Sequence, residues 1–282
     1  MRKGYRKAAI AAAIAFLAAL ASLPVALGRL EHAMIETGPN GPETPAGLGL
    51  AFERLKIPSG NRVLDGYLVE SAPSCQRHRA LLIFHGVGET ISQWVKVQRL
   101  LYDSCIASVV FDYSGNGDSS RPGTVGNLHQ DAIAAYSAFQ AHFGTAGRVC
   151  TLGFSMGNAV LLDAYTEFQP PPGCMILGGA FSSGRDSAVR GWGIPKWMAR
   201  ALPDQWNNVA AISRSHPPLL VIHSDADSVN PLWMGQRIYQ AAPEPKQLVI
   251  LHGLRHNAAY RGAIEQWWGP VIEFIEQAGT VP

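Results

Sequence analysis

The pattern Gly-x-Ser-x-Gly at Gly153–Gly157 constrains the fold of this chain more than any other feature. An apolar, strand-like run over 148–152 precedes it, and a helix-like run over 158–168 follows it. A strand that reverses directly into a helix needs strained backbone dihedrals, and a Cβ at either glycine would crowd the neighbouring strand or the helix start. The pattern therefore predicts a tight turn that exposes the Ser155 hydroxyl and leaves backbone N–H groups beside it.

Polar or glycine-rich segments also follow four other apolar runs of the chain. They are 85–88 after the run 80–84, 112–119 after 108–111, 223–227 after 219–222, and 252–257 after 247–251. Short continuous apolar runs are typical of strands buried in a parallel sheet. Because open α/β sheets place their sites at the carboxyl ends of their strands, we expect a serine, an acid and a histidine to meet at one edge of this sheet.

These five segments resemble the motifs of the α/β-hydrolase superfamily, specifically its small membrane-anchored or secreted serine hydrolases of the Bem46 and ABHD17 type. The resemblance extends over residues 52–278. It implies a mostly parallel, eight-stranded sheet with helices on both faces and a small lid insert. It also implies Ser155 as the nucleophile, Asp227 as the acid and His256 as the base, working without a metal ion or an organic cofactor.

The resemblance further implies an oxyanion hole made by the backbone N–H groups of Met156 and Val87. The multi-glycine oxyanion loop of many lipases is absent from the sequence, so Gly88 stays an alternative to Val87. A serine hydroxyl is a poor nucleophile near neutral pH and needs a histidine to take its proton, and that histidine needs an acceptor to hold its tautomer. Losing one oxyanion donor typically costs about 3 to 4 kcal/mol in the transition state.

The acid and the base each have a competitor nearby in the sequence. Side chains alternate along a strand, so Asp225 and Asp227 are expected on the same side. The resemblance favours Asp227, because the distance from it to Pro231 matches the family's spacing. His252 directly ends a strand and is expected to be structural, whereas His256 lies four residues into the loop and has the reach of a base.

Two further histidines, His85 and His223, also end strands. We expect both to be hydrogen-bonded structural residues. Metal binding by the histidines is the weaker alternative, because neither His-x-x-x-His nor Cys-x-x-Cys accompanies them in the sequence.

Residues 1–30 are predicted to be an export signal or an N-terminal membrane anchor. The first seven residues contain four basic side chains and no acid, and an uncharged apolar run extends from Ala8 to Gly28. Such a run is long enough to span a bilayer of about 30 Å, which favours an uncleaved anchor. The basic end predicts a catalytic domain outside the cytoplasm, which is periplasmic or secreted if the signal is cleaved.

The rest of the chain is predicted to be a linker over 31–51 and one hydrolase domain over 52–282. Residues 37–49 are rich in Pro and Gly, and the 47% hydrophobic content of the chain is sufficient for one large core. Without the four basic residues of the first seven, 19 basic and 21 acidic residues remain, a net charge of −2. This balance argues against a nucleic acid partner.

An insert over 183–216 is a candidate lid. It contains three tryptophans, Trp192, Trp197 and Trp206, which are expected to form an apolar wall for the substrate. The alternative is that the insert simply packs on the domain, and the sequence favours neither interpretation.

The four cysteines form an even set that an oxidising compartment would allow to pair. Cys75 and Cys105 precede two strands that we expect to be neighbours, so they are the better candidate pair. Cys150 and Cys174 fall inside apolar strands and are expected to be buried free thiols.

These features predict a serine hydrolase that cleaves carboxylic esters or thioesters of a small molecule with an apolar acyl group, through an acyl-enzyme intermediate. A peptidase or amidase, and an acyltransferase, would use the same triad. From a different class, a binding protein that retains a non-catalytic hydrolase fold is the remaining alternative.

Overall fold

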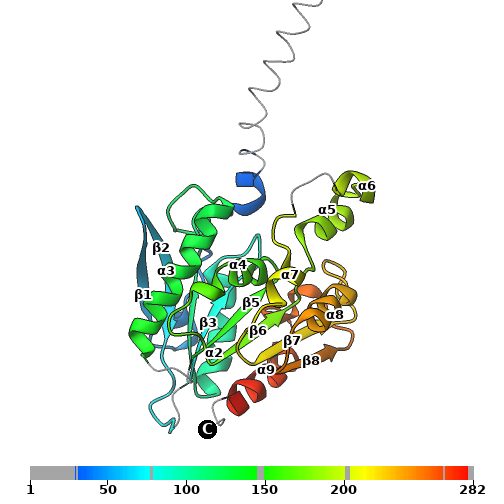
Figure 1. Ribbon diagram of the computed structural model, residues 1–282. Coiled ribbons are helices and arrows are strands. Elements are labelled where there is room, and N and C mark those ends of the chain that lie inside the picture. Colours follow the sequence, from blue (N-terminus) through cyan, green and yellow to red (C-terminus); the bar gives the residue numbers. More distant parts are fainter. Residues whose placement is uncertain are drawn as a thin grey trace, which may run out of the picture.

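The computed structural model describes residues 29, 31–76, 79–144, 149–200, 204–262 and 264–278. Its centre is an eight-stranded sheet with the order β1-β2-β4-β3-β5-β6-β7-β8 (Figure 1). The strands are β1 Glu53–Ser59, β2 Arg62–Val69, β3 Arg79–Phe84, β4 Ile106–Phe111, β5 Val149–Phe154, β6 Cys174–Gly178, β7 Leu219–Ser224 and β8 Lys246–Leu251. β1 pairs with β2, and β2 with β4, in antiparallel orientation, and the remaining pairs are parallel.

Helices cover both faces of this sheet (Figure 1). They are α2 Val95–Asp103, α3 Val125–Phe143, α4 Met156–Ala164, α5 Gly184–Trp192, α6 Lys196–Ala199, α7 Asn208–Ile212, α8 Leu232–Ala241 and α9 Ile264–Ala278. Short 3-10 turns stand at η1 Pro45–Leu48, η2 Ile91–Trp94, η3 Tyr165–Glu167 and η4 His256–Ala259. The predicted fold, a mostly parallel eight-stranded sheet between helical layers, is confirmed.

The alternation of side chains along the strands divides the interior into two cores. On β3, Leu82 and Phe84 pack into the core that contains residues of α3, α4, α7 and α8. Leu81 and Ile83 point to the opposite face and pack with α2 and α9. Both faces of the central strands are therefore apolar, which is why these strands are continuous hydrophobic runs in the sequence.

The segment predicted as a linker, 31–51, is instead packed on the domain. Ile35 and Leu50 are buried, and Ile35 belongs to the core beside α3. The carboxylate of Glu36 accepts a hydrogen bond from the Gly123 N–H and forms an ion pair with Arg121 at 2.7 Å. The Pro and Gly content of the segment reflects its turns, and buried apolar side chains between them attach it to the sheet.

Both cysteine pairs are disulfides. The predicted bond between Cys75 and Cys105 is present. The expectation of free thiols at Cys150 and Cys174 is wrong, because these two residues are direct partners in the parallel pairing of β5 with β6 and form a second disulfide. Burial inside strands does not imply free thiols here, because the two strands are neighbours and their paired residues place both side chains on the same face of the sheet.

Apart from Arg29, the predicted signal or anchor over 1–30 lies outside the described residues. Among the residues that are described, none of the helices is long and apolar enough to cross a bilayer.

Candidate active site

The turn between β5 and α4 holds Ser155 in a conformation that few side chains adopt, with φ 52° and ψ −116°. A Cβ on Gly157 would overlap the carbonyl of Phe84 on the neighbouring strand, and one on Gly153 would lie 2.7 Å from the Cα of Asn158. The amide of Asn158 donates to the carbonyl oxygen of Ser155 at 2.9 Å and braces the turn. Both glycines are thus required by close backbone contacts, as the sequence predicts.

Three side chains from three strand ends meet at this turn. The Nε2 atom of His256 lies 3.0 Å from the Ser155 Oγ, and its Nδ1 lies 2.6 Å from the Asp227 Oδ2. An ionised carboxylate only accepts hydrogen bonds, so Nδ1–H donates to Asp227 and Nε2 is left to accept the hydroxyl proton of Ser155. The structure therefore brings together Ser155, Asp227 and His256 in the geometry of a nucleophile, a base and an orienting acid.

The orientation of the Asp227 carboxylate is fixed by the loop after β7. Its Oδ1 accepts hydrogen bonds from the backbone N–H groups of Val229 and Asn230, both at 2.9 Å. The Asp227 side chain is 2% exposed, whereas that of His256 is 14% exposed. The buried acid is held in place and the imidazole reaches toward the cavity.

The competing acid and histidine pair with each other at the surface. The Asp225 Oδ2 lies 2.7 Å from the His252 Nδ1, and its other oxygen accepts from the Gly253 N–H. These hydrogen bonds lower the pKa of the Asp225 carboxyl. The His252 side chain is 82% exposed, and the pair connects the loops after β7 and β8.

The other two strand-end histidines are buried and hydrogen-bonded. The His223 Nε2 lies 2.7 Å from the carbonyl oxygen of Asn230, and burial lowers the pKa of the His223 imidazole. The His85 Nδ1 lies 2.8 Å from the Gly86 carbonyl oxygen. Burial lowers the pKa of His85, but the Asp112 carboxylate 3.3 Å from its Nε2, together with Glu89 and the Gly86 carbonyl, more than offsets this, so the pKa is raised. Within the described ranges, no group of three or more His, Cys, Asp or Glu residues is placed to hold a metal ion.

The predicted oxyanion residues, Val87 and Met156, both line the cavity above Ser155. Met156 is the first residue of α4, and the N–H groups of a first helical turn have no acceptor within the helix. The Val87 side chain is 49% exposed at the tip of the loop after β3.

Sequence reasoning missed Glu89, which holds this loop from inside. One oxygen of its buried carboxyl accepts from the Gly86 N–H at 2.8 Å and from the Trp94 indole N–H at 3.0 Å. Burial raises the pKa of the Glu89 carboxyl, although His85 and the two donors oppose the shift. A carboxyl placed two residues after the predicted oxyanion position was the available signal.

A cavity of about 590 Å³ opens above Ser155. Most of its lining is apolar, and it has three walls: the loop after β3, the insert around α5, and residues 31–35 at the start of the described chain. The third wall, which includes Met34 and Ile35, belongs to the segment that the sequence analysis described as a linker.

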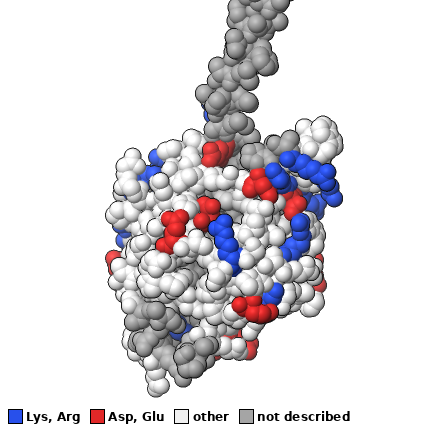
Figure 2. Space-filling model, in the orientation of Figure 1, with Lys and Arg blue, Asp and Glu red and all other residues white. Residues whose placement is uncertain are grey.

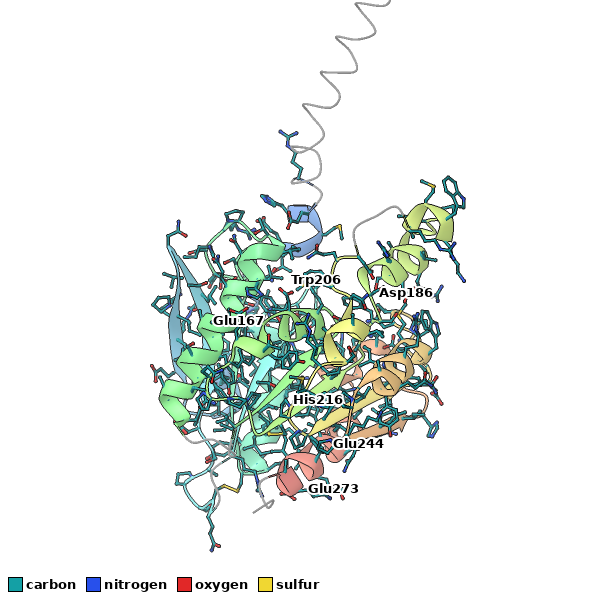
Figure 3. All side chains as sticks on the ribbon, viewed as in Figure 1. Glu167, Asp186, Trp206, His216, Glu244 and Glu273 are labelled. Atoms are coloured by element: carbon teal, nitrogen blue, oxygen red, sulfur yellow. A yellow bond between two sulfur atoms is a disulfide. The ribbon has the colours of Figure 1, made fainter. Side chains whose placement is uncertain are left out.

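The structure places the three insert tryptophans differently. Trp206 lines the cavity and contacts Phe181, with ring centroids 6.5 Å apart, and it lies between residues 31–35 and α5 (Figure 3). Trp197 is 73% exposed on α6 and is not part of the cavity lining, which corrects the expectation that it forms a substrate wall. The Trp192 side chain lies outside the described part of the structure.

Known proteins are similar to this chain in sequence. Residues 76–211 match the family model described as serine aminopeptidase, S33. An uncharacterized protein of Mycobacterium tuberculosis is 30% identical over 181 residues, which are 63% of this chain and 63% of that protein. Human alpha/beta hydrolase domain-containing protein 17B is 28% identical over 168 residues, 59% of this chain and 54% of that protein. The chain thus matches less than two thirds of the length of these relatives.

Solved structures show the same fold. The Pyrococcus furiosus esterase Pf2001 superposes with a TM-score of 0.70 at 18% identity, covering 86% of this chain and 99% of that one. Est1E from Butyrivibrio proteoclasticus, solved with ferulic acid, gives a TM-score of 0.63 at 17% identity, covering 79% of this chain and 98% of that one. The fold and the sequence matches together show that the chain belongs to the α/β-hydrolase superfamily. Within that superfamily its sequence is similar to the ABHD17 type.

Proposed function

We propose that this hydrolase cleaves carboxylic esters or thioesters with an apolar acyl group through an acyl-enzyme intermediate. The observation that carries the proposal is the hydrogen-bonded series from Asp227 through His256 to the Ser155 Oγ, which ends at the base of an apolar cavity. A series of this kind activates a serine for attack on an acyl carbon.

In the proposed reaction the Ser155 Oγ attacks the substrate carbonyl carbon while His256 Nε2 takes its proton. The backbone N–H groups of Met156 and Val87 stabilise the oxyanion of the tetrahedral intermediate. The intermediate collapses and expels an alcohol or thiol, which receives the proton from His256. Water then repeats the sequence on the acyl-enzyme, releasing a carboxylic acid and free Ser155. An acyltransferase would differ in using a second alcohol in place of water.

Aminopeptidase activity, which the description of the matching family suggests, is the second candidate. An enzyme of that kind needs acidic groups that bind the substrate's amino terminus. Among the residues that line the cavity, Glu31 is the one acid, and its carboxylate accepts a hydrogen bond from the Val125 N–H at 2.7 Å. The apolar lining of the remaining walls therefore favours an acyl chain over an amino terminus.

A fluorophosphonate probe tests the nucleophile. We expect the full chain to be labelled and the Ser155→Ala variant to be unlabelled. Absence of labelling in the wild type would contradict the proposal and favour a non-catalytic binding protein. A panel of acyl esters, thioesters and aminoacyl amides then tests the substrate class, and faster cleavage of the amides would favour the aminopeptidase.

We also propose that residues 1–30 anchor the protein in a membrane, with the catalytic domain on the side that faces away from the cytoplasm. Two disulfides in the described chain support this proposal, because disulfides persist mainly in oxidising compartments. Fusing residues 1–50 to a reporter that is active only after export tests it. Activity of a cytoplasmic reporter in the same fusion would contradict it.

A further inference from the structure

We propose that the end of the molecule that carries the cavity mouth and α6 rests on an anionic lipid bilayer, and that the substrate's acyl chain passes from the bilayer into the cavity. The acyl-chain step rests on the proposed function, and the surface contact does not. Three separate observations converge on this face: exposed apolar side chains, exposed basic side chains on α5 and α6, and the position of residues 31–35.

Exposed large apolar side chains are concentrated at this end. Met34, Val87 and Val229 line the cavity and are 43%, 49% and 55% exposed. On α6, Trp197 is 73% exposed and Met198 is 45% exposed. Tryptophan at a protein surface suits the interface between lipid headgroups and acyl chains, because its ring is apolar and its N–H remains polar.

The same insert is basic. Residues 187–203 contain three basic side chains and no acid. These are Arg190, Lys196 and Arg200, and all three are exposed. Figure 2 shows blue side chains gathered at the upper right of the molecule, with red side chains beside them, where Figure 1 places α5 and α6. A tryptophan flanked by cations matches an anionic bilayer surface in both charge and polarity.

Residues 31–35, near the start of the described chain, lie at this face (Figure 1). Glu31 accepts a hydrogen bond from the Val125 N–H at the start of α3. Ile35 is buried in the core beside α3, so residues 31–35 are attached to the domain at both ends. The uncharged apolar run of the sequence ends at Gly28, three residues before Glu31. Three residues span at most about 11 Å, so a bilayer that holds this run lies close to the cavity wall.

The test uses the full chain, reconstituted into vesicles of neutral phosphatidylcholine or of phosphatidylcholine with phosphatidylglycerol, with the domain outward. Brominated acyl chains quench the fluorescence of tryptophans that reach the bilayer. The chain has seven tryptophans, so the Trp197 signal is the difference between the wild type and Trp197→Phe. We expect this difference to be quenched by brominated lipid, and more strongly in anionic vesicles.

Turnover of two esters is measured in the same vesicles, one a long-chain acyl ester embedded in the bilayer and the other a short water-soluble ester. Reversing charge in Lys196→Glu with Arg200→Glu is expected to lower turnover of the embedded ester on the order of tenfold in anionic vesicles. Turnover of the short ester is expected to stay unchanged. Lys96→Glu, on the exposed side of α2, is the charge control.

An unquenched Trp197 difference signal would overturn the proposal. Quenching with no loss of embedded-ester turnover in the charge-reversed variant would also overturn it, since the surface contact would then play no part in delivering substrate. Failure of the wild type to cleave either ester would contradict the proposed function instead, and the quenching measurement would still decide the surface contact.

Discussion

The Oδ2 atom of Asp227 lies 2.6 Å from the Nδ1 atom of His256, and the loop after β7 fixes the orientation of this carboxylate. Its second oxygen is occupied by two backbone N–H groups, those of Val229 and Asn230. Asp225, two residues earlier, forms a similarly short pair with His252 at 2.7 Å, but that pair is at the surface. Distance alone does not separate the two acids, whereas burial and the hydrogen bond that the Ser155 hydroxyl donates to His256 do.

We predict that Ser155, His256 and Asp227 act as one unit. Ser155→Ala and His256→Ala are each expected to lower kcat by several orders of magnitude, and combining them is expected to cost little more, because either change already removes the same proton transfer. Asp227→Asn is expected to lower kcat by roughly 10⁴-fold, because an amide disfavours the required histidine tautomer. Steady-state kinetics on a short ester measures all of these effects.

Asp225→Asn and His252→Gln are the matched controls, and both are expected to retain most of the wild-type activity. If Asp225→Asn inactivates the enzyme and Asp227→Asn does not, the acid has been misassigned. If the effects of Ser155→Ala and His256→Ala multiply, the two residues do not share one proton-transfer step.

A second prediction concerns Glu89, which we expect to position the oxyanion loop without touching the substrate. Glu89→Ala leaves the Gly86 N–H and the Trp94 indole N–H without their acceptor. A loop displaced by about 1 Å typically costs on the order of a hundredfold in rate. We expect this loss in kcat with little change in KM, and partial recovery in Glu89→Gln, which keeps one acceptor oxygen. A change confined to KM would contradict a role in positioning the oxyanion donors.

The third prediction is that burial of Glu89 makes the free energy of unfolding depend on pH. Burial raises its pKa in the folded state above the ordinary value of about 4.3. The protonated carboxyl therefore favours the folded state fully below that ordinary value, and this contribution is lost as the pH rises through the folded-state pKa. Glu89→Gln does not titrate, so its free energy of unfolding should rise relative to the wild type as the pH increases from 4 to above the folded-state pKa. Parallel pH curves from chemical denaturation would contradict this prediction.

The fourth prediction concerns the disulfide between Cys150 and Cys174, which was not expected from the sequence. Cys150 and Cys174 are 24 residues apart, and closing a loop of that length stabilises a fold by about 3 kcal/mol. Replacing both with Ala is expected to lower the free energy of unfolding by at least that amount, because both side chains are buried. Replacing Cys75 and Cys105, 30 residues apart, gives the comparison variant. Thiol titration of the denatured, unreduced protein should find no free thiol, and two free thiols would contradict the second bond.

Local patterns in the sequence were sufficient to predict the parts of the molecule that local sterics determine. The turn at Ser155 follows from two glycines, and the strand ends follow from apolar runs that stop at polar residues. The pairing of Cys150 with Cys174 depends on which strands are neighbours and in what register, and the third cavity wall depends on Ile35 packing into a distant core. Neither contact can be read from the spacing of apolar and polar residues along the sequence.

The last prediction uses two tryptophans of the same insert, one inside the cavity wall and one outside it. Trp206→Ala removes part of the wall and should allow longer acyl chains to bind. Each additional buried methylene contributes roughly 0.8 kcal/mol, or about a fourfold gain in kcat/KM. We therefore expect Trp206→Ala to shift the preference among soluble esters toward longer chains while hydrolysis of the shortest ester stays near the wild-type rate. Trp197→Ala, with its side chain directed to solvent, should leave this preference unchanged in the absence of a bilayer. A shift in Trp197→Ala and none in Trp206→Ala would mean that the acyl chain does not occupy this cavity.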